Sequence, residues 1–133
     1  MTTACDSSLL VPALNARHRE HLAAQASMVG VTAVPGHVLL ETYSVLTRLA
    51  PPLRVAPQDA AAALAQLATD VIDLSPGRRR QLVVDCARQG IGGGAVYDAL
   101  VAATAAEHGM VLLSRDRRAR STYDAMGVRY RIV

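Results

Sequence analysis

Short apolar segments alternate with longer helical patterns along this chain, and the alternation narrows the folds that the chain can adopt. The strand candidates are residues 2–5, 31–34, 71–74, 110–114 and 128–133. The helical patterns cover residues 16–29, 37–49, 58–68, 76–88, 95–108 and 117–126. Alternation of this kind is typical of βαβ units, in which parallel strands form one sheet. We therefore predict an α/β fold, a three-layer α/β/α sandwich with a mainly parallel central sheet.

Length and composition favour one domain over residues 1–133, in the cytoplasm. Hydrophobic residues make up 51% of the 133 residues, which is enough for a sizeable core. No apolar run reaches the roughly 18 residues of a membrane span, and the start, MTTACDSSLLVP, lacks the basic segment of a signal peptide. Two cysteines, Cys5 and Cys86, do not make a disulfide framework. We expect no contact with a membrane.

The charge pattern permits a nucleic-acid partner and excludes some enzymes. All 14 basic residues are arginine, whose planar guanidinium fits phosphate oxygens, although a GC-rich genome explains the arginine equally well. With four Tyr, no Trp and no Phe, recognition through many stacked bases is not expected. The absence of lysine excludes a P-loop nucleotide site, which needs a lysine on the phosphates.

Four acidic residues occupy positions where α/β proteins build sites. Asp6 and Asp116 follow the first strand and the clearest strand, and sites of open parallel sheets form at the carboxyl ends of strands. Asp98 lies in the first turn of a helix and Glu41 within another, both among apolar residues. A carboxylate near a helix start complements the helix dipole. That explains Asp98 alone, but not all four acids.

The surroundings of Glu41 and Asp98 point to a metal ion. Neither residue has a lysine or arginine three or four positions away, and a carboxylate directed toward a core needs a partner. Two carboxylates about 4 Å apart repel each other by roughly 4 kcal/mol at an effective dielectric constant near 20. A divalent cation would remove this repulsion, and an all-oxygen ligand set favours Mg²⁺ or Mn²⁺ over zinc.

These segments resemble, in order, the four motifs of the PIN-domain family, and specifically its short VapC-type toxins. ACDSSLLVPAL resembles the first motif, with Asp6 and Ser8, and LLETYSVLTRL the second, with Glu41. GGAVYDALVAATAAEHG, with Asp98, is the most specific match, and LLSRDRRA resembles the fourth motif with Ser114 and Asp116. The resemblance covers the whole chain. In the first strand, Thr and Ala stand where the family tends to have larger β-branched residues.

The resemblance implies a Mg²⁺- or Mn²⁺-dependent endoribonuclease that cleaves RNA as the toxin of a toxin–antitoxin pair. It also implies that a cognate antitoxin protein inhibits the enzyme and that the enzyme is usually a homodimer. Asp6, Asp98 and Asp116 would bind the metal, and Glu41 would either bind it or orient the attacking water. Ser8 and Ser114 would support these acids. The arginines that flank the fourth acid would contact RNA phosphates or simply face solvent; they are Arg115, Arg117 and Arg118.

Other interpretations are weaker. GIGGGA at 90–95 matches a dinucleotide-binding fingerprint, but a helical pattern precedes it where a strand is needed. His18 and His21 lack a third zinc ligand, and His37 and His108 are expected at surface or capping positions. A phosphohydrolase with an aspartyl nucleophile would need a second Asp where Ser8 stands. The main alternative is a catalytically silent module of the same fold that binds RNA or a protein, although all four acids are present.

Overall fold

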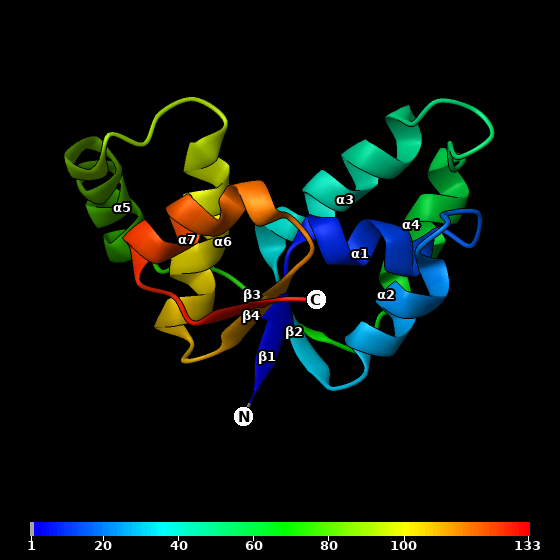
Figure 1. The fold of residues 1–133 in the computed structure, drawn as a ribbon, viewed down its shortest axis with the longest axis horizontal. Coiled ribbons are helices and arrows are strands. Elements are labelled where there is room, and N and C mark those ends of the chain that lie inside the picture. The colour runs from blue at the N-terminus through cyan, green and yellow to red at the C-terminus, as the bar shows by residue number, and fades with distance from the viewer. Residues whose placement is uncertain (1) are drawn as a thin grey trace.

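A five-stranded parallel sheet forms the centre of the computed structural model, which describes residues 2–133. The strand order is β3-β2-β1-β4-β5, and every neighbouring pair is parallel (Figure 1). The strands are β1 (Thr3–Cys5), β2 (Val31–Pro35), β3 (Asp70–Ile72), β4 (Val111–Ser114) and β5 (Tyr130–Ile132). The chain winds outward from β1 in both directions, so the carboxyl ends of β1 and β4 lie side by side at the middle of one edge.

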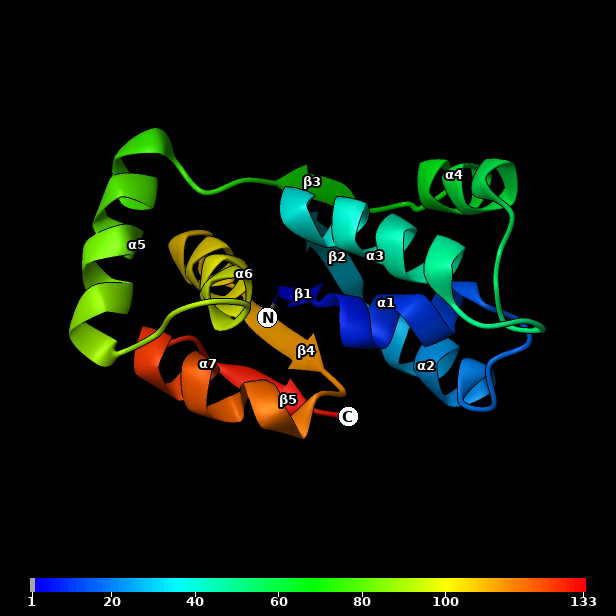
Figure 2. The same ribbon diagram turned by 90° about the horizontal axis from the view of Figure 1, so that it is seen from above.

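Helices cover both faces of the sheet, which confirms the predicted three-layer α/β fold. One face carries α1 (Ser7–Leu14), α2 (His21–Met28), α3 (Gly36–Arg48) and α4 (Pro57–Ala65). The other carries α5 (Pro76–Gln89), α6 (Ala95–Glu107) and α7 (Arg120–Met126) (Figure 2). Within residues 2–133, none of these helices has the length and apolar character needed to cross a bilayer.

The core lies on both sides of β1 and β4. All residues of these two strands are buried, as expected for the central strands of a parallel sheet. Small residues do much of this packing: Ala99, Ala102 and Ala105 of α6 are fully buried. Alanine on that face lets α6 approach the sheet closely, and this brings the start of α6 toward the edge where β1 and β4 end.

The first helix differs from the prediction. We expected a helix over 16–29, whereas the structure has α1 immediately after β1 and begins α2 only at His21. Pro12 lies inside α1 at a buried position. The Asn15 side chain accepts a hydrogen bond from the backbone of Arg17 at 3.2 Å, a local turn that competes with helix. The chain therefore turns between α1 and α2.

Two further segments bear on the predicted sites. Residues 117–126 form a short 3₁₀ turn (Arg117–Ala119) followed by α7, not one continuous helix. The glycine-rich loop at 90–94 follows α5, so the strand that a dinucleotide fingerprint requires is replaced by a helix. The helix predicted before GIGGGA is confirmed.

Candidate active site

The four predicted acids gather at the carboxyl edge of the central strands. Asp6 directly follows β1, and Asp116 lies two residues after β4. Glu41 on α3 and Asp98 at the start of α6 come from helices that contact each other. Glu41, Asp116 and Asp6 each act electrostatically on Asp98. The topology thus brings together residues that are far apart in the sequence.

Asp6 is buried and held by hydroxyl groups. Ser8 Oγ donates a hydrogen bond to Asp6 Oδ1 at 2.6 Å, and the Tyr123 hydroxyl donates to Asp6 Oδ2 at 2.6 Å. Burial raises the pKa of Asp6, and these hydroxyl bonds oppose the rise because they favour the ionised form. Burial, together with the charge of Asp6, raises the pKa of Tyr123 well above its usual range, so Tyr123 stays a donor. Both oxygens of Asp6 therefore have fixed directions.

Tyr123→Phe tests this arrangement, because it removes one hydrogen bond from Asp6 with little change in packing. Loss of a bond to a charged group should lower the free energy of unfolding at pH 7 by about 1–3 kcal/mol and raise the pKa of Asp6 further. Urea unfolding and NMR titration of the carboxyl group measure the two effects. Tyr130→Phe, which loses an exposed bond to Asp124, is the control. An equal loss of stability in both variants would contradict the role given to Tyr123.

Ser8 and Ser114 connect Asp6 with Asp116. The two hydroxyl oxygens lie 3.2 Å apart. Ser8 Oγ also accepts a bond from the backbone N–H of Arg115 at 2.7 Å, and Ser114 Oγ accepts one from the N–H of Asp116 at 3.0 Å. Asp116 itself accepts a bond from the N–H of Arg118 at 2.9 Å, which caps the 3₁₀ turn. The two serines stand where the sequence places them, between the first and fourth acids.

Asp98 carries the clearest sign of unneutralised charge. Burial raises its pKa to about 6, and the negative charges of Glu41, Asp116 and Asp6 add to the rise. Among residues 2–133, no arginine forms an ion pair with Asp6, Glu41 or Asp98. A site that concentrates negative charge in this way has a strong electrostatic preference for a cation.

The three arginines beside Asp116 neutralise little of the negative charge of the acids. Arg115 pairs with Glu20 at 3.4 Å. Arg118 is 95% exposed and lies 3.6 Å from Asp116, a geometry that contributes little in water. Arg117 is exposed as well. The contact of these three arginines with RNA phosphates therefore stays a prediction.

The donor chemistry of the site fits a hard divalent cation. The four side chains offer carboxylate oxygens, the ligands that Mg²⁺ and Mn²⁺ prefer. Within residues 2–133, however, no three Asp, Glu, His or Cys side chains form a ready metal-binding group. Some carboxylate oxygens are engaged elsewhere: Ser7 Oγ donates to Glu41 Oε1, and Asp116 caps the 3₁₀ turn. Cation binding would therefore need these side chains to adjust.

Four residues at the site were not predicted from the sequence. Ser7 contacts Glu41, and Tyr123 contacts Asp6 from α7. His37, expected at a surface or capping position, instead lies beside the acids, with its Nε2 atom 3.4 Å from Glu41 Oε2. Its ring stacks on Tyr97. The spacing of His37 and Glu41, four residues apart on one helix, was the available signal; Tyr123 had none, because 117 residues separate it from Asp6.

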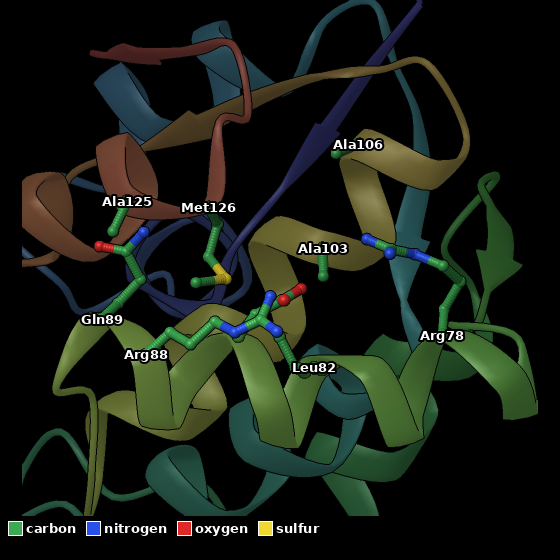
Figure 3. A pocket seen from close by; sticks show the side chains of 9 residues that line it. Arg78, Leu82, Arg88, Gln89, Ala103, Ala106, Ala125 and Met126 are labelled. Atoms are coloured by element: carbon green, nitrogen blue, oxygen red, sulfur yellow. The ribbon is translucent and has the colours of Figure 1, made fainter.

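A hollow between α5, α6 and α7 is a separate feature (Figure 3). Its volume is about 310 Å³, and its walls include Arg78, Leu82 and Arg88 of α5 with Met126 of α7. None of the four acids lines it. The cluster of acids, and not this hollow, is the place where several unneutralised groups converge.

Comparison with known proteins places this geometry in a family. The family model described as PIN domain matches residues 4–125. The chain is 46% identical to ribonuclease VapC27 of Mycobacterium tuberculosis over 126 residues, 94% of this chain and 92% of that protein. It is 40% identical to ribonuclease VapC40 of the same species over 129 residues, 96% of each chain.

Solved structures share the fold. Mycobacterium tuberculosis VapC20, described as a sarcin–ricin loop cleaving toxin, superposes with a TM-score of 0.73 at 21% identity, over 91% of this chain and 94% of that one. VapBC2 from Rickettsia felis, bound to a DNA fragment from its promoter, gives a TM-score of 0.69 at 15% identity, over 100% and 99% of the chains. At these identities the likeness extends to the fold alone.

Proposed function

The chain belongs to the PIN-domain family, and from this premise we propose that it is an endoribonuclease that acts as the toxin of a toxin–antitoxin pair. One observation carries the proposal: four carboxylates, from the end of β1, from α3, from α6 and from the segment after β4, lie at one edge, and among residues 2–133 the exposed Arg118, beside Asp116, is the one arginine that pairs with any of them. Relatives named ribonucleases, with 40–46% identity over nearly the full chain, support the same activity. The reaction is hydrolysis of RNA phosphodiester bonds.

We propose that Asp6, Asp98 and Asp116 hold Mg²⁺ or Mn²⁺. Bound there, the cation would neutralise the acids, acidify a water molecule and polarise the scissile phosphate. Asp6 is pre-oriented for this role by Ser8 and Tyr123, and Ser114 connects it to the backbone of Asp116. Such hydroxyl contacts behind ligating carboxylates restrict their motion and tune their affinity.

Glu41 has a different environment from the three aspartates. Ser7 donates a hydrogen bond to one of its oxygens, and His37 faces the other at 3.4 Å. These contacts hold the carboxylate near Asp98, where it can accept a proton from the attacking water or complete the cation site. Both roles need the carboxylate form of Glu41.

The partners follow from the same premise. We propose that a cognate antitoxin inhibits the protein by placing a basic side chain among the acids, where it would compete with the cation and with RNA. We also propose a cytoplasmic homodimer. Leu22, Val29 and Leu40 are apolar and more than 70% exposed, and we propose that they contribute to contacts with these partners.

Metal-dependent cleavage of total cellular RNA tests the proposal. Protein stripped of metal with a chelator should leave the RNA intact, and Mg²⁺ or Mn²⁺ should restore cleavage, because the unneutralised acids repel phosphate. Gel electrophoresis and sequencing of the new ends provide the readout. Asp59→Asn, which removes an exposed carboxylate on α4, should cleave like the wild type.

Two results would overturn this assignment. Cleavage that persists without metal and at equal rate in a variant lacking Asp98 would indicate a contaminating nuclease. Absence of both cleavage and metal binding would favour the alternative, a silent module of this fold that binds RNA or a protein. Metal binding with no cleavage of total RNA would instead indicate a narrow RNA target that is missing from the assay.

A further inference from the structure

An aromatic pair, with one ring half-exposed and the other mostly buried, lies directly beside the acids. His37 of α3 and Tyr97 of α6 stack with ring centroids 5.1 Å apart and planes inclined by only 6°. At that separation parallel rings are offset, so each covers only part of the other. His37 also faces Glu41, and Tyr97 precedes Asp98 in the sequence. The pair therefore joins the two helices that carry two of the four acids.

Tyr97 differs from Tyr123 and Tyr130. Tyr123 is buried, and the Tyr130 hydroxyl is bonded to Asp124. Tyr97 is 53% exposed although one of its ring faces rests on His37, so much of the remaining ring surface is in contact with solvent. Within residues 2–133, its hydroxyl has no side-chain hydrogen bond like those of Tyr123 and Tyr130. The stack on His37 positions the ring and leaves much of its surface open to a ligand.

The surface next to Tyr97 is open. Gly92, Gly93 and Gly94 precede α6, and a side-chain carbon added at any of them would meet no other atom within 4 Å. With Tyr97 itself 53% exposed, its ring is accessible to a planar group. His37 supports the opposite face, which limits the rotation of Tyr97 and lowers the entropy lost when a ligand stacks on it.

We infer that Tyr97, supported by His37, is a stacking platform for one base of the RNA whose phosphate lies at the acids. This inference rests on the proposed ribonuclease function and adds a subsite to it. A nucleobase fits because its flat face matches an open aromatic ring. The stacked base would belong to a nucleotide next to the phosphate that lies at the acids. The scarcity of aromatic residues argues against a tract of stacked bases, and one platform suits a single base.

A unique fluorophore at the platform tests the inference directly. The chain has no tryptophan, so Tyr97→Trp introduces a single reporter at this position. A short single-stranded oligo(A), added with Ca²⁺ in place of Mg²⁺, should quench its fluorescence. An abasic ribose-phosphate oligomer of the same length should not, because it presents phosphates without bases. Tyr43→Trp is the control; it lies two residues beyond Glu41 and so roughly 200° around α3, and it should not respond.

Affinity measurements separate stacking from charge. Tyr97→Ala should weaken binding of oligo(A) by roughly 5- to 100-fold, the usual effect of losing one base–aromatic stack, and should leave binding of the abasic oligomer unchanged. Tyr97→Phe, which keeps the ring, should bind oligo(A) like the wild type. Thermal unfolding of each variant confirms that it is folded.

The outcomes distinguish this inference from the proposed function. Equal oligo(A) affinity of wild type and Tyr97→Ala, with no quenching in Tyr97→Trp, would overturn the platform even if the wild type cleaves RNA. Failure of the wild type to bind oligo(A) would overturn it as well, because stacking tolerates any base. An equal loss of affinity for both oligomers would assign Tyr97 to the charged site, also against the inference. Failure of metal-dependent cleavage would instead refute the ribonuclease itself.

Discussion

Asp98→Asn should abolish RNA cleavage and, at the same time, stabilise the metal-free protein. The substitution keeps the size of the side chain but removes one of the charges proposed to bind the cation. Loss of a supporting contact to a metal ligand already costs about 10- to 100-fold in affinity or activity, so loss of the ligand's charge should reduce the cleavage rate by at least about 100-fold. Single-turnover cleavage of total RNA with Mn²⁺ measures it.

The gain in stability follows from the pKa of Asp98. Burial, and then the neighbouring acids, raise this pKa from 3.8 to about 6. The folded protein therefore holds the proton of Asp98 up to a higher pH than the unfolded chain does, and stability falls as the pH rises through this window. The cost should reach about 1–3 kcal/mol above pH 6, with allowance for screening by solvent. Asparagine has no such charge and avoids the cost.

Unfolding by urea in a chelator at several pH values checks this result. The pKa of Asp98 is 3.8 in the unfolded chain and about 6 in the folded protein. The stability gained by Asp98→Asn should therefore be absent near pH 3.8, grow up to about pH 6 and stay constant above that. Added Mg²⁺ should stabilise the wild type more than the variant, because ligands that bind the native state raise its stability. Asp59→Asn should show neither effect. A variant less stable than the wild type at neutral pH would contradict the unneutralised charge.

The positions of the four acids were predictable because topology alone brings them together. Asp6 and Asp116 follow strands whose patterns are visible in the sequence, and the carboxyl ends of parallel strands share one edge. Asp98 and Glu41 stand out as carboxylates in apolar helices without nearby arginine. Each of these signals is local, within one turn or one strand of the residue concerned.

The contacts that orient the acids were not predictable from such signals. Tyr123 reaches Asp6 from α7, and the pairing depends on how that helix packs against the sheet. The contact of Ser7 with Glu41 depends on α1, a helix that was not predicted from the sequence. His37 and Tyr97 meet because α3 and α6 cross at the edge of the sheet. Each of these contacts joins residues of different elements, so it depends on how the elements pack together. The sequence pattern of a single helix or strand does not predict it.

Ser8→Ala should disrupt the whole site, because the Ser8 hydroxyl uses all of its hydrogen-bonding capacity there. A hydroxyl has one proton and two lone pairs. Ser8 donates its proton to Asp6 and accepts a bond from the N–H of Arg115. Its contact with Ser114 must therefore be a bond donated by Ser114. A continuous series of hydrogen bonds thus runs from the N–H of Asp116 through Ser114 and Ser8 to Asp6.

Removal of the central hydroxyl should lower the cleavage rate about 10- to 100-fold and the free energy of unfolding by about 1–3 kcal/mol, since it leaves polar partners unpaired. Ser121→Ala, at an exposed serine of α7, is the matched control and should change neither. Ser114→Ala breaks the same series one step away, so the double variant should lose less than the sum of the two single losses. Fully additive losses would mean that Asp6 and Asp116 are positioned independently, and the hydroxyl series would then not couple the first acid to the fourth.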